Sequence, residues 1–170
     1  SQMNLLNNPL AESGIAVSTS EDIRWKRRDI KSVNLLAQCL AKQDAHSKGA
    51  NEGWMVEDGF VTEGVTSSAY IVKERKIITR PLSNSILPGI RRRTLIEIAE
   101  REGIELEQRL FTLEEALQAD EAFISSATTI TLPVVSIDGE KIADGIPGEI
   151  TGKLRKMYIK RLLQEANNSE

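Results

Sequence analysis

Apolar positions recur at helical spacing in three parts of the chain. Over residues 31–48 the apolar side chains fall three or four positions apart, and Gly49 follows them. This spacing predicts an amphipathic helix that ends at a glycine stop. The same pattern predicts a second helix that starts after Pro88-Gly89 and stops at Gly103, and a terminal helix over residues 147–165.

Short runs of β-branched and aromatic residues separate these helices, and glycine-containing or charged turn sequences divide the runs from one another. This alternation is typical of hairpins and predicts an antiparallel meander in the middle of the chain. Thr112 and Glu115 also have the spacing of a capping box, which predicts a short helix through Ala119. The predicted strands cover residues 15–17, 54–57, 60–62, 69–73, 77–80, 104–110, 122–126 and 130–137, with a short return at 141–142.

The mixture of short strands and helices predicts a mixed α/β (α+β) fold, with mostly antiparallel strands flanked by helices. With 170 residues the chain suits one core. We expect residues 1–20 to be a lead-in with a short strand, residues 21–166 to form the domain, and residues 167–170 to be a disordered tail.

Composition excludes several classes of function. The formal charge is −3, from 22 basic and 25 acidic residues, and a nucleic-acid partner normally needs a larger basic face. No apolar run approaches the roughly 20 residues that span a bilayer, so we expect no membrane partner and a cytoplasmic protein. Cys39 and His46 are the only residues of their kinds, so cysteine-based zinc sites are excluded and no metal is expected. The helical pattern predicts a buried Cys39 and a solvated His46 near the helix end.

Lys31 is the strongest candidate for chemistry. It lies where a strand-like run becomes the first predicted helix, with Ile30 and Val33 among its apolar neighbours. Such a lysine can be held out of bulk water, which lowers its pKa and frees the amine to form an imine with pyridoxal phosphate. Glu63, between two β-type runs and followed by Gly64, could face the pyridine nitrogen of that cofactor. The alternatives are a solvated surface lysine and an ordinary turn glutamate.

Two further segments could hold a phosphate. Leu87-Pro88-Gly89-Ile90-Arg91 opens the second predicted helix, whose first backbone N–H groups and positive dipole end favour an anion. Ser125-Ser126-Ala127-Thr128-Thr129 follows a strand and adds hydroxyl and N–H donors. An ordinary helix start and an ordinary Ser/Thr loop remain the alternatives.

Several segments together resemble the class IV pyridoxal-phosphate aminotransferases, most closely the D-amino acid aminotransferase branch. They occur in the family's order and spacing, from about residue 8 to 165, which makes the set more specific than any one motif. The segments are Glu21-Asp22-Ile23-Arg24-Trp25, Asp29-Ile30-Lys31-Ser32-Val33-Asn34-Leu35-Leu36, Val61-Thr62-Glu63-Gly64 with Ser67-Ser68, Leu87-Pro88-Gly89-Ile90, and Pro133-Val134-Val135 with Ile137-Asp138-Gly139.

The resemblance implies the C-terminal large domain of a fold-type IV enzyme that carries out transamination between amino acids and 2-oxo acids. Lys31 would be the Schiff-base lysine and Glu63 would face the pyridine nitrogen. Arg91 and Ala127 depart from the family pattern, because relatives often place phosphate-binding threonines there. The cofactor-binding residues implied are Lys31, Glu63, Ser67, Ser68, Leu87, Gly89, Ile90, Arg91, Ser126, Ala127 and Thr128.

The resemblance also implies an additional N-terminal small domain, which this chain lacks, and a homodimer. Branched-chain aminotransferase and aminodeoxychorismate lyase activities stay open, because the same lysine and cofactor can serve both. A hypothesis of another class is a catalytically incompetent fragment that acts only as a folding or interaction module.

Overall fold

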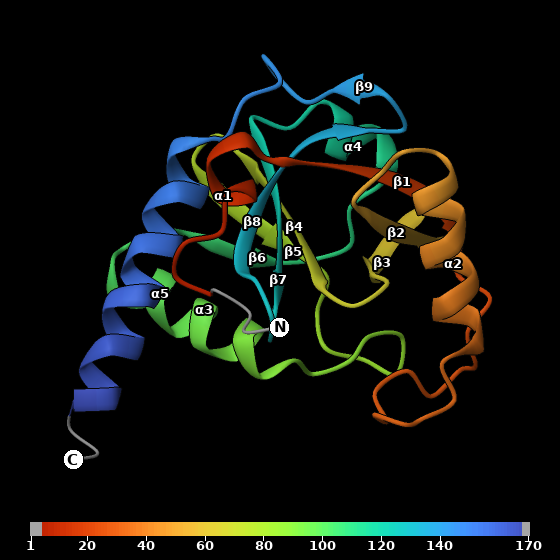
Figure 1. The fold of residues 1–170 in the computed structure, drawn as a ribbon, viewed down its shortest axis with the longest axis horizontal. Coiled ribbons are helices and arrows are strands. Elements are labelled where there is room, and N and C mark those ends of the chain that lie inside the picture. Colours follow the sequence, from red (N-terminus) through yellow and green to blue (C-terminus); the bar gives the residue numbers. More distant parts are fainter. Residues whose placement is uncertain (1–4, 168–170) are drawn as a thin grey trace.

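A curled nine-stranded sheet organises residues 5–167, the part of the chain that this computed structural model describes (Figure 1). The predicted strands are present, and several are one to four residues longer than the sequence pattern indicates. The strand predicted over residues 104–110 is shorter and covers only Leu106–Gln108. Their bounds are β1 Ile15–Glu21, β2 Glu52–Glu57, β3 Phe60–Gly64, β4 Ser68–Lys73, β5 Lys76–Thr79, β6 Leu106–Gln108, β7 Glu121–Ser126, β8 Ile130–Ile137 and β9 Glu140–Lys141.

The strands follow the order β3-β2-β1-β8-β7-β4-β5-β6, and β9 pairs with β8. Pairs β1–β2, β1–β8 and β5–β6 are parallel, and the other pairs are antiparallel. The prediction of mostly antiparallel strands is therefore confirmed. The prediction of a meander is wrong, because β1, β8 and β7 insert between the β2–β3 and β4–β5 hairpins. Turn sequences specify each hairpin but not the order in which hairpins join a sheet.

The two ends of the strand order approach each other. Phe60 of β3 forms an isolated bridge with Thr112, just beyond β6, and the Val61 N–H donates to the Phe111 carbonyl at 3.1 Å. The sheet therefore curls into a barrel-like shape whose inner apolar residues include Trp54, in edge contact with the Phe111 ring at 6.2 Å between ring centroids.

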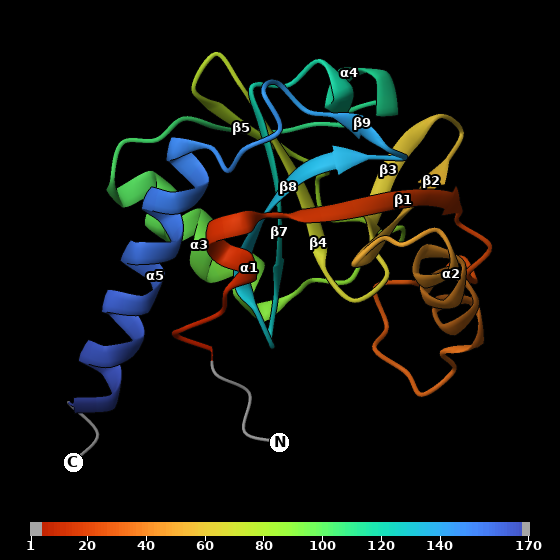
Figure 2. The ribbon, with the colours of Figure 1, turned by 45° about the horizontal axis from the view of Figure 1, so that its top comes forward.

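Helices cover the sheet on two sides, and their bounds are α1 Leu10–Ser13, α2 Leu36–Ser47, α3 Ile90–Arg101, α4 Leu113–Leu117 and α5 Glu149–Asn167. Figures 1 and 2 show α3 and α5 next to each other on one side, while α2 packs against β1 and β2 on the other. Residues alternate along β4: Ala69 and Ile71 join the core inside the curl, whereas Tyr70 and Val72 join a second core under α3 and α5. The central strands are thus buried on both faces.

The first predicted helix begins later than its apolar spacing indicates. Helix α2 starts at Leu36, so the predicted start at Lys31 is wrong. Only its alanine stripe, Ala41 and Ala45, is buried, because these small side chains let the helix approach β2 closely. Leu36 is 69% exposed.

The single cysteine and histidine both lie on α2. Cys39 is exposed, so the prediction of its burial is wrong. It lies on the leucine stripe of α2, formed with the exposed Leu36 and Leu40, which faces away from the sheet. His46 is exposed in the last turn, as predicted.

The capping-box prediction is confirmed in one part and wrong in the other. The Glu115 N–H donates to the Thr112 hydroxyl at 3.1 Å, which confirms the helix start, but the Glu115 carboxylate pairs with Arg109 instead of completing the capping box. The predicted lead-in contains α1 and most of β1. Asn167 ends α5, and residues 1–4 and 168–170 lie outside the described residues. Within residues 5–167, no helix has the length and apolar character needed to cross a bilayer.

Candidate functional site

Lys31 lies on the long loop that joins β1 to α2, and its side chain is exposed. The apolar neighbours expected to shelter it point outward as well, with Ile30 43% and Val33 98% exposed. The prediction that local sequence holds this amine out of water is therefore wrong, because the loop continues to Leu35 and no helix starts beside the lysine. Any shelter for Lys31 must come from groups that cover this loop.

Glu63 is buried at the end of β3 and is held from two directions. Its Oε1 atom lies 2.5 Å from the Arg24 Nη1 atom, and the Leu87 N–H donates to both carboxylate oxygens at 3.2–3.3 Å. The two side chains of the ion pair are only 6% and 8% exposed. The fold therefore brings Glu63 next to Leu87, although the two residues are far apart along the chain.

Charge alternates behind Glu63. The Arg24 guanidinium donates to both oxygens of Asp22 at 2.7–2.8 Å, and the Thr62 hydroxyl donates to Asp22 at 2.6 Å. Arg28 follows at 3.4 Å from Asp22 and 2.8 Å from Glu57. Burial raises the pKa of Glu63, and the positive charge of Arg24 opposes that rise.

Small residues bring the start of β4 close to Glu63. A Cβ on Gly64 would lie 2.0 Å from the Ser67 Oγ atom, so only glycine leaves room for that hydroxyl in the turn between β3 and β4. The Ser67 Oγ atom is buried without a hydrogen-bond partner in the described part of the chain. A buried hydroxyl without a partner is costly, and this one keeps an open hydrogen-bonding position beside Glu63 and Gly64.

Helix α3 begins beside Ser68. A Cβ on Gly89, the N-cap residue, would lie 3.6 Å from the Ser68 Oγ atom, and no side chain caps the helix. The first N–H groups of a helix have no intrahelical partners, so those of Ile90 and Arg91 remain as donors at the positive end of the dipole. This end of α3 can hold an anion.

The turn between β7 and β8 lies against the same end of α3. The Arg91 guanidinium stacks over the Tyr158 ring at 5.2 Å, and its Nη2 atom lies 3.5 Å from the Ala127 carbonyl oxygen. Ser126 hydrogen-bonds the Thr128 hydroxyl at 3.1 Å and accepts the Thr128 N–H at 3.3 Å. Strand pairing also places Ser125 opposite Ser68.

A strained residue closes this turn. Ile130 has φ of 64°, which is rare for a β-branched residue, and its side chain is fully buried under α5. The buried Arg155 of α5 donates to the carbonyls on either side, at 2.7 Å to Thr129 and 2.8 Å to Thr131. Strain of this kind persists where surrounding contacts fix the backbone.

The structure thus brings together ten of the eleven residues predicted from sequence, through direct contacts, short turns and strand pairing. Lys31 is exposed on the loop that also carries Arg24, and within the described residues it makes no hydrogen bond or ion pair with these ten. Sequence reasoning missed the supporting groups Arg24, Asp22 and Arg155. The signal for the first two was present, since they fall within one of the segments that carry the family resemblance, but nothing in the sequence indicates that Arg155 meets the distant turn.

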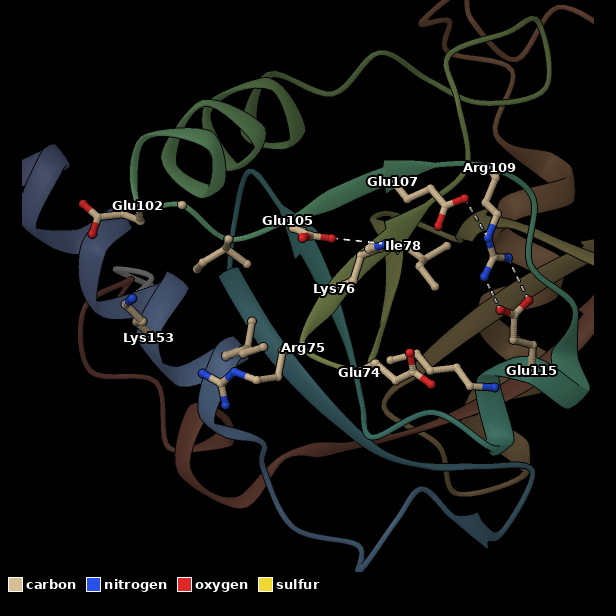
Figure 3. A pocket seen from close by; sticks show the side chains of 14 residues that line it. Glu74, Arg75, Lys76, Ile78, Glu102, Glu105, Glu107, Arg109, Glu115 and Lys153 are labelled. Carbon is tan, nitrogen blue, oxygen red and sulfur yellow. Dashed lines mark hydrogen bonds and ion pairs between the residues drawn. The ribbon is translucent and has the colours of Figure 1, made fainter.

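Grooves in the surface of the described residues differ in their position relative to this cluster. One of about 560 Å³ runs beside the start of α3 and is lined by Gly89 and Ile90 among others. A larger one of about 710 Å³ lies between β5, β6 and the start of α5 (Figure 3). Five of its charged lining residues form ion pairs within the groove: Lys76 pairs with Glu105 at 3.2 Å, and Arg109 pairs with Glu107 and Glu115. None of the predicted site residues lines it. The candidate site is therefore the cluster around Glu63 and the start of α3.

Comparison with known sequences places this cluster in context. The model of the family described as amino-transferase class IV matches residues 3–137. The D-alanine aminotransferase of Bacillus licheniformis is 40% identical over 154 residues, which cover 91% of this chain and 54% of that protein. The D-alanine aminotransferase of Staphylococcus haemolyticus is 43% identical over 149 residues, covering 88% and 53%. The chain spans about half the length of the curated relatives it matches.

Solved structures of aminotransferases are also similar to this chain. The branched-chain amino acid aminotransferase of Thermobaculum terrenum in its PLP form has a TM-score of 0.80 at 29% identity, covering 91% of this chain and 53% of that one. The branched-chain amino acid aminotransferase of Escherichia coli has a TM-score of 0.79 at 28% identity, covering 91% and 54%. The mixed fold and its strand arrangement are therefore those of aminotransferases of this kind.

Proposed function

Because the chain belongs to the class IV aminotransferase family, we propose that it is the cofactor-binding part of a pyridoxal-phosphate-dependent aminotransferase. The observation that supports this most directly is the convergence of Glu63, the unpartnered Ser67 hydroxyl and the uncapped start of α3. An acidic group and an anion site side by side are what a phosphorylated pyridine requires. The donor set therefore fits the cofactor.

Each residue has a role in this proposal. Lys31 would hold the cofactor covalently, and its free amine would take and return the α-proton of the substrate. Glu63 would accept the N–H of the pyridine ring, and Leu87 would pack against that ring. Ser67 and Ser68 would lie near the ring, and Gly89 would leave room at the helix start. When bound, the cofactor serves as an electron sink for the charge left at the substrate α-carbon.

The phosphate would bind between α3 and the β7–β8 turn. Its donors are the N–H groups of Ile90 and Arg91, with Ser126, Ala127 and Thr128 on the facing turn. The Ser126–Thr128 hydrogen bonds hold that turn in one shape. Ala127 offers only its N–H, so the backbone supplies much of the binding.

We propose small amino acids and 2-oxo acids as substrates, with D-amino acids preferred. Relatives at 40–43% identity are D-alanine aminotransferases. Branched-chain transamination is the alternative, since the solved structures cited above are branched-chain enzymes. Chiral analysis of products from paired amino-donor and oxo-acid screens separates these activities, and release of pyruvate without an acceptor would instead indicate a lyase.

Activity requires partners that cover the Lys31 loop. Trp25, Val33 and Leu36 present apolar surface to solvent there, 47%, 98% and 69% exposed. Exposed apolar surface of this extent is typical of an interface. We propose that a second copy of the chain and an N-terminal domain of the kind found in the longer relatives shelter Lys31 in the active enzyme.

The first experiment is reduction of the protein with borohydride in the presence of pyridoxal phosphate. We expect a visible absorption band that disappears when borohydride reduces the imine to a secondary amine, and a stable covalent adduct on Lys31 by peptide mass analysis. Lys31→Ala should lose both, whereas Lys26→Ala, which removes an exposed lysine of the same loop, should keep both. An adduct that persists in Lys31→Ala would refute the role of Lys31.

A second candidate function is an interaction module without catalysis. The exposure of Lys31 and of the apolar residues around it favours this function for the isolated chain. Cofactor binding without turnover would support the module, whereas turnover would support the enzyme.

A further inference from the structure

Arg24 has no role in the chemistry proposed above, yet it contacts the central acid of the site. It lies on the β1–α2 loop and is the only cation among the described residues that pairs with Glu63. Its remaining donors, Nε and Nη2, bind the two oxygens of Asp22, so the planar guanidinium is fixed in a single orientation. Its side chain is 6% exposed, although the loop around it is open.

The two carboxylate oxygens of Glu63 have different hydrogen-bond partners. Oε1 accepts from Arg24 at 2.5 Å, while Oε2 accepts only the Leu87 N–H, at 3.2 Å, within the described residues. A carboxylate oxygen can accept two hydrogen bonds. Oε2 therefore keeps an open acceptor position.

The charges around Glu63 decide whether that oxygen carries a proton. Arg24 faces it directly, Asp22 lies behind Arg24, and Arg28 pairs with Asp22 at 3.4 Å. Asp22 keeps its own negative charge through Arg24, Thr62 and Arg28. Without Arg24 the pKa of this buried carboxyl would rise further, so Glu63 would bind a proton more readily, and a protonated Oε2 atom would present a donor to the N–H of a cationic ring.

We propose that Arg24, supported by Asp22, is the positioning residue that keeps Glu63 ionised and turns its Oε2 atom toward the pyridine nitrogen of the cofactor. The identity of the ligand in this inference rests on the proposed function. The claim that Arg24 keeps Glu63 ionised rests only on contacts within the chain.

The test compares Arg24→Met with Arg27→Met. Arg27 is a matched control, because it lies on the same loop and binds Asp29 at 2.9 Å but is exposed. The ligand is pyridoxamine 5'-phosphate, which needs no covalent bond to Lys31. Losing one charge-assisted hydrogen bond should weaken its binding roughly tenfold or more in Arg24→Met. Arg27→Met should bind like the unaltered chain, and Arg24→Lys, which keeps the charge, should recover part of the loss.

A second readout requires no ligand. Infrared spectra of protein with ¹³C-labelled glutamate carboxyls, assigned by subtraction of Glu63→Gln, report whether Glu63 carries a proton. We expect its protonation to shift to higher pH in Arg24→Met only. Melting curves verify that each variant is folded. If Arg24→Met does not fold, Arg24→Lys replaces it in the binding and infrared comparisons.

The outcomes separate the two claims. If the unaltered chain binds neither pyridoxal phosphate nor pyridoxamine phosphate, the proposed function is overturned, and the infrared result still decides whether Arg24 controls Glu63. If the chain binds both but Arg24→Met matches Arg27→Met in affinity and in the infrared titration, the role of Arg24 is overturned while the proposed function stands.

Discussion

Replacement of Gly148 by alanine should remove the N-terminal cap of α5, because the new methyl group would displace the capping carboxylate of Glu121 on β7. The carboxylate of Glu121, at the start of β7, accepts the N–H groups of Ile150 and Thr151 at 2.8 and 2.9 Å and the Thr151 hydroxyl at 2.7 Å. A Cβ on Gly148 would lie 1.9 Å from the Glu121 Cδ atom and 2.3 Å from its Oε2 atom. The carboxylate must therefore move away from the helix.

The contacts set the size of the effect. Ile150 and Thr151 are 5% and 1% exposed, so water replaces the lost carboxylate only in part. An N-terminal cap contributes about 1 kcal/mol, and hydrogen bonds to a charged group about 1.5–3 kcal/mol each before such replacement. We expect Glu121→Ala and Gly148→Ala each to lower the free energy of unfolding by about 2 kcal/mol.

Urea denaturation of both single variants and the double variant tests this mechanism. In the Glu121→Ala background the space beside Gly148 is empty, so Gly148→Ala should cost about 0 kcal/mol, which makes the pair strongly non-additive. Gly152→Ala is the control on the same helix, because a Cβ at that position would meet nothing within 4 Å; it should be neutral or stabilising by up to about 1 kcal/mol. Additive costs of Glu121→Ala and Gly148→Ala would refute the reasoning.

Two further predictions concern the loop and α2. Arg28 and Lys26 lower the pKa of Glu57 from 4.5 to about 2, so its ion pairs stabilise the fold above pH 4.5 and lose that contribution as the pH falls toward 2. Glu57→Gln should therefore cost about 1 kcal/mol at pH 7 after solvent screening, with the difference from the unaltered chain vanishing near pH 2; a difference that does not change with pH would contradict this. Cys39 should react with a thiol reagent in the native chain nearly as fast as in urea, and a strongly protected thiol would mean that the leucine stripe of α2 is covered.

Local patterns predicted the elements well and their limits poorly. Short β-type runs and the turn sequences between them located the hairpins, and the apolar spacing before Gly103 located α3, because each signal depends on neighbours in sequence. The start of α2 was misplaced because Val33 continues the helical spacing of apolar residues although it lies in a loop and is 98% exposed. Spacing alone cannot distinguish residues that face a core from residues that face a separate surface.

Site residues that belong to recognisable sequence motifs could be predicted from the sequence. Residues that support the site through tertiary contacts could not. Glu63, Ser68 and Ile90 came from segments with recognisable sequence, and the structure gathers them. Arg155 reaches the β7–β8 turn only because α5 crosses β8, a contact between residues more than twenty positions apart. Such contacts depend on tertiary packing, for which one sequence gives no local signal.

The short connection between β3 and β4 determines how strongly the sheet must curve. Four strands separate these two in the sheet order, so in a flat sheet they would stand about 24 Å apart at about 4.8 Å per neighbour. The four residue steps from Gly64 to Ser68 reach at most about 14 Å when fully extended. Curvature is therefore enforced by chain length, and Glu63 and Ser68 belong to one rigid frame. A ligand that binds between Glu63 and Ser68 therefore meets a surface whose shape the chain length already fixes.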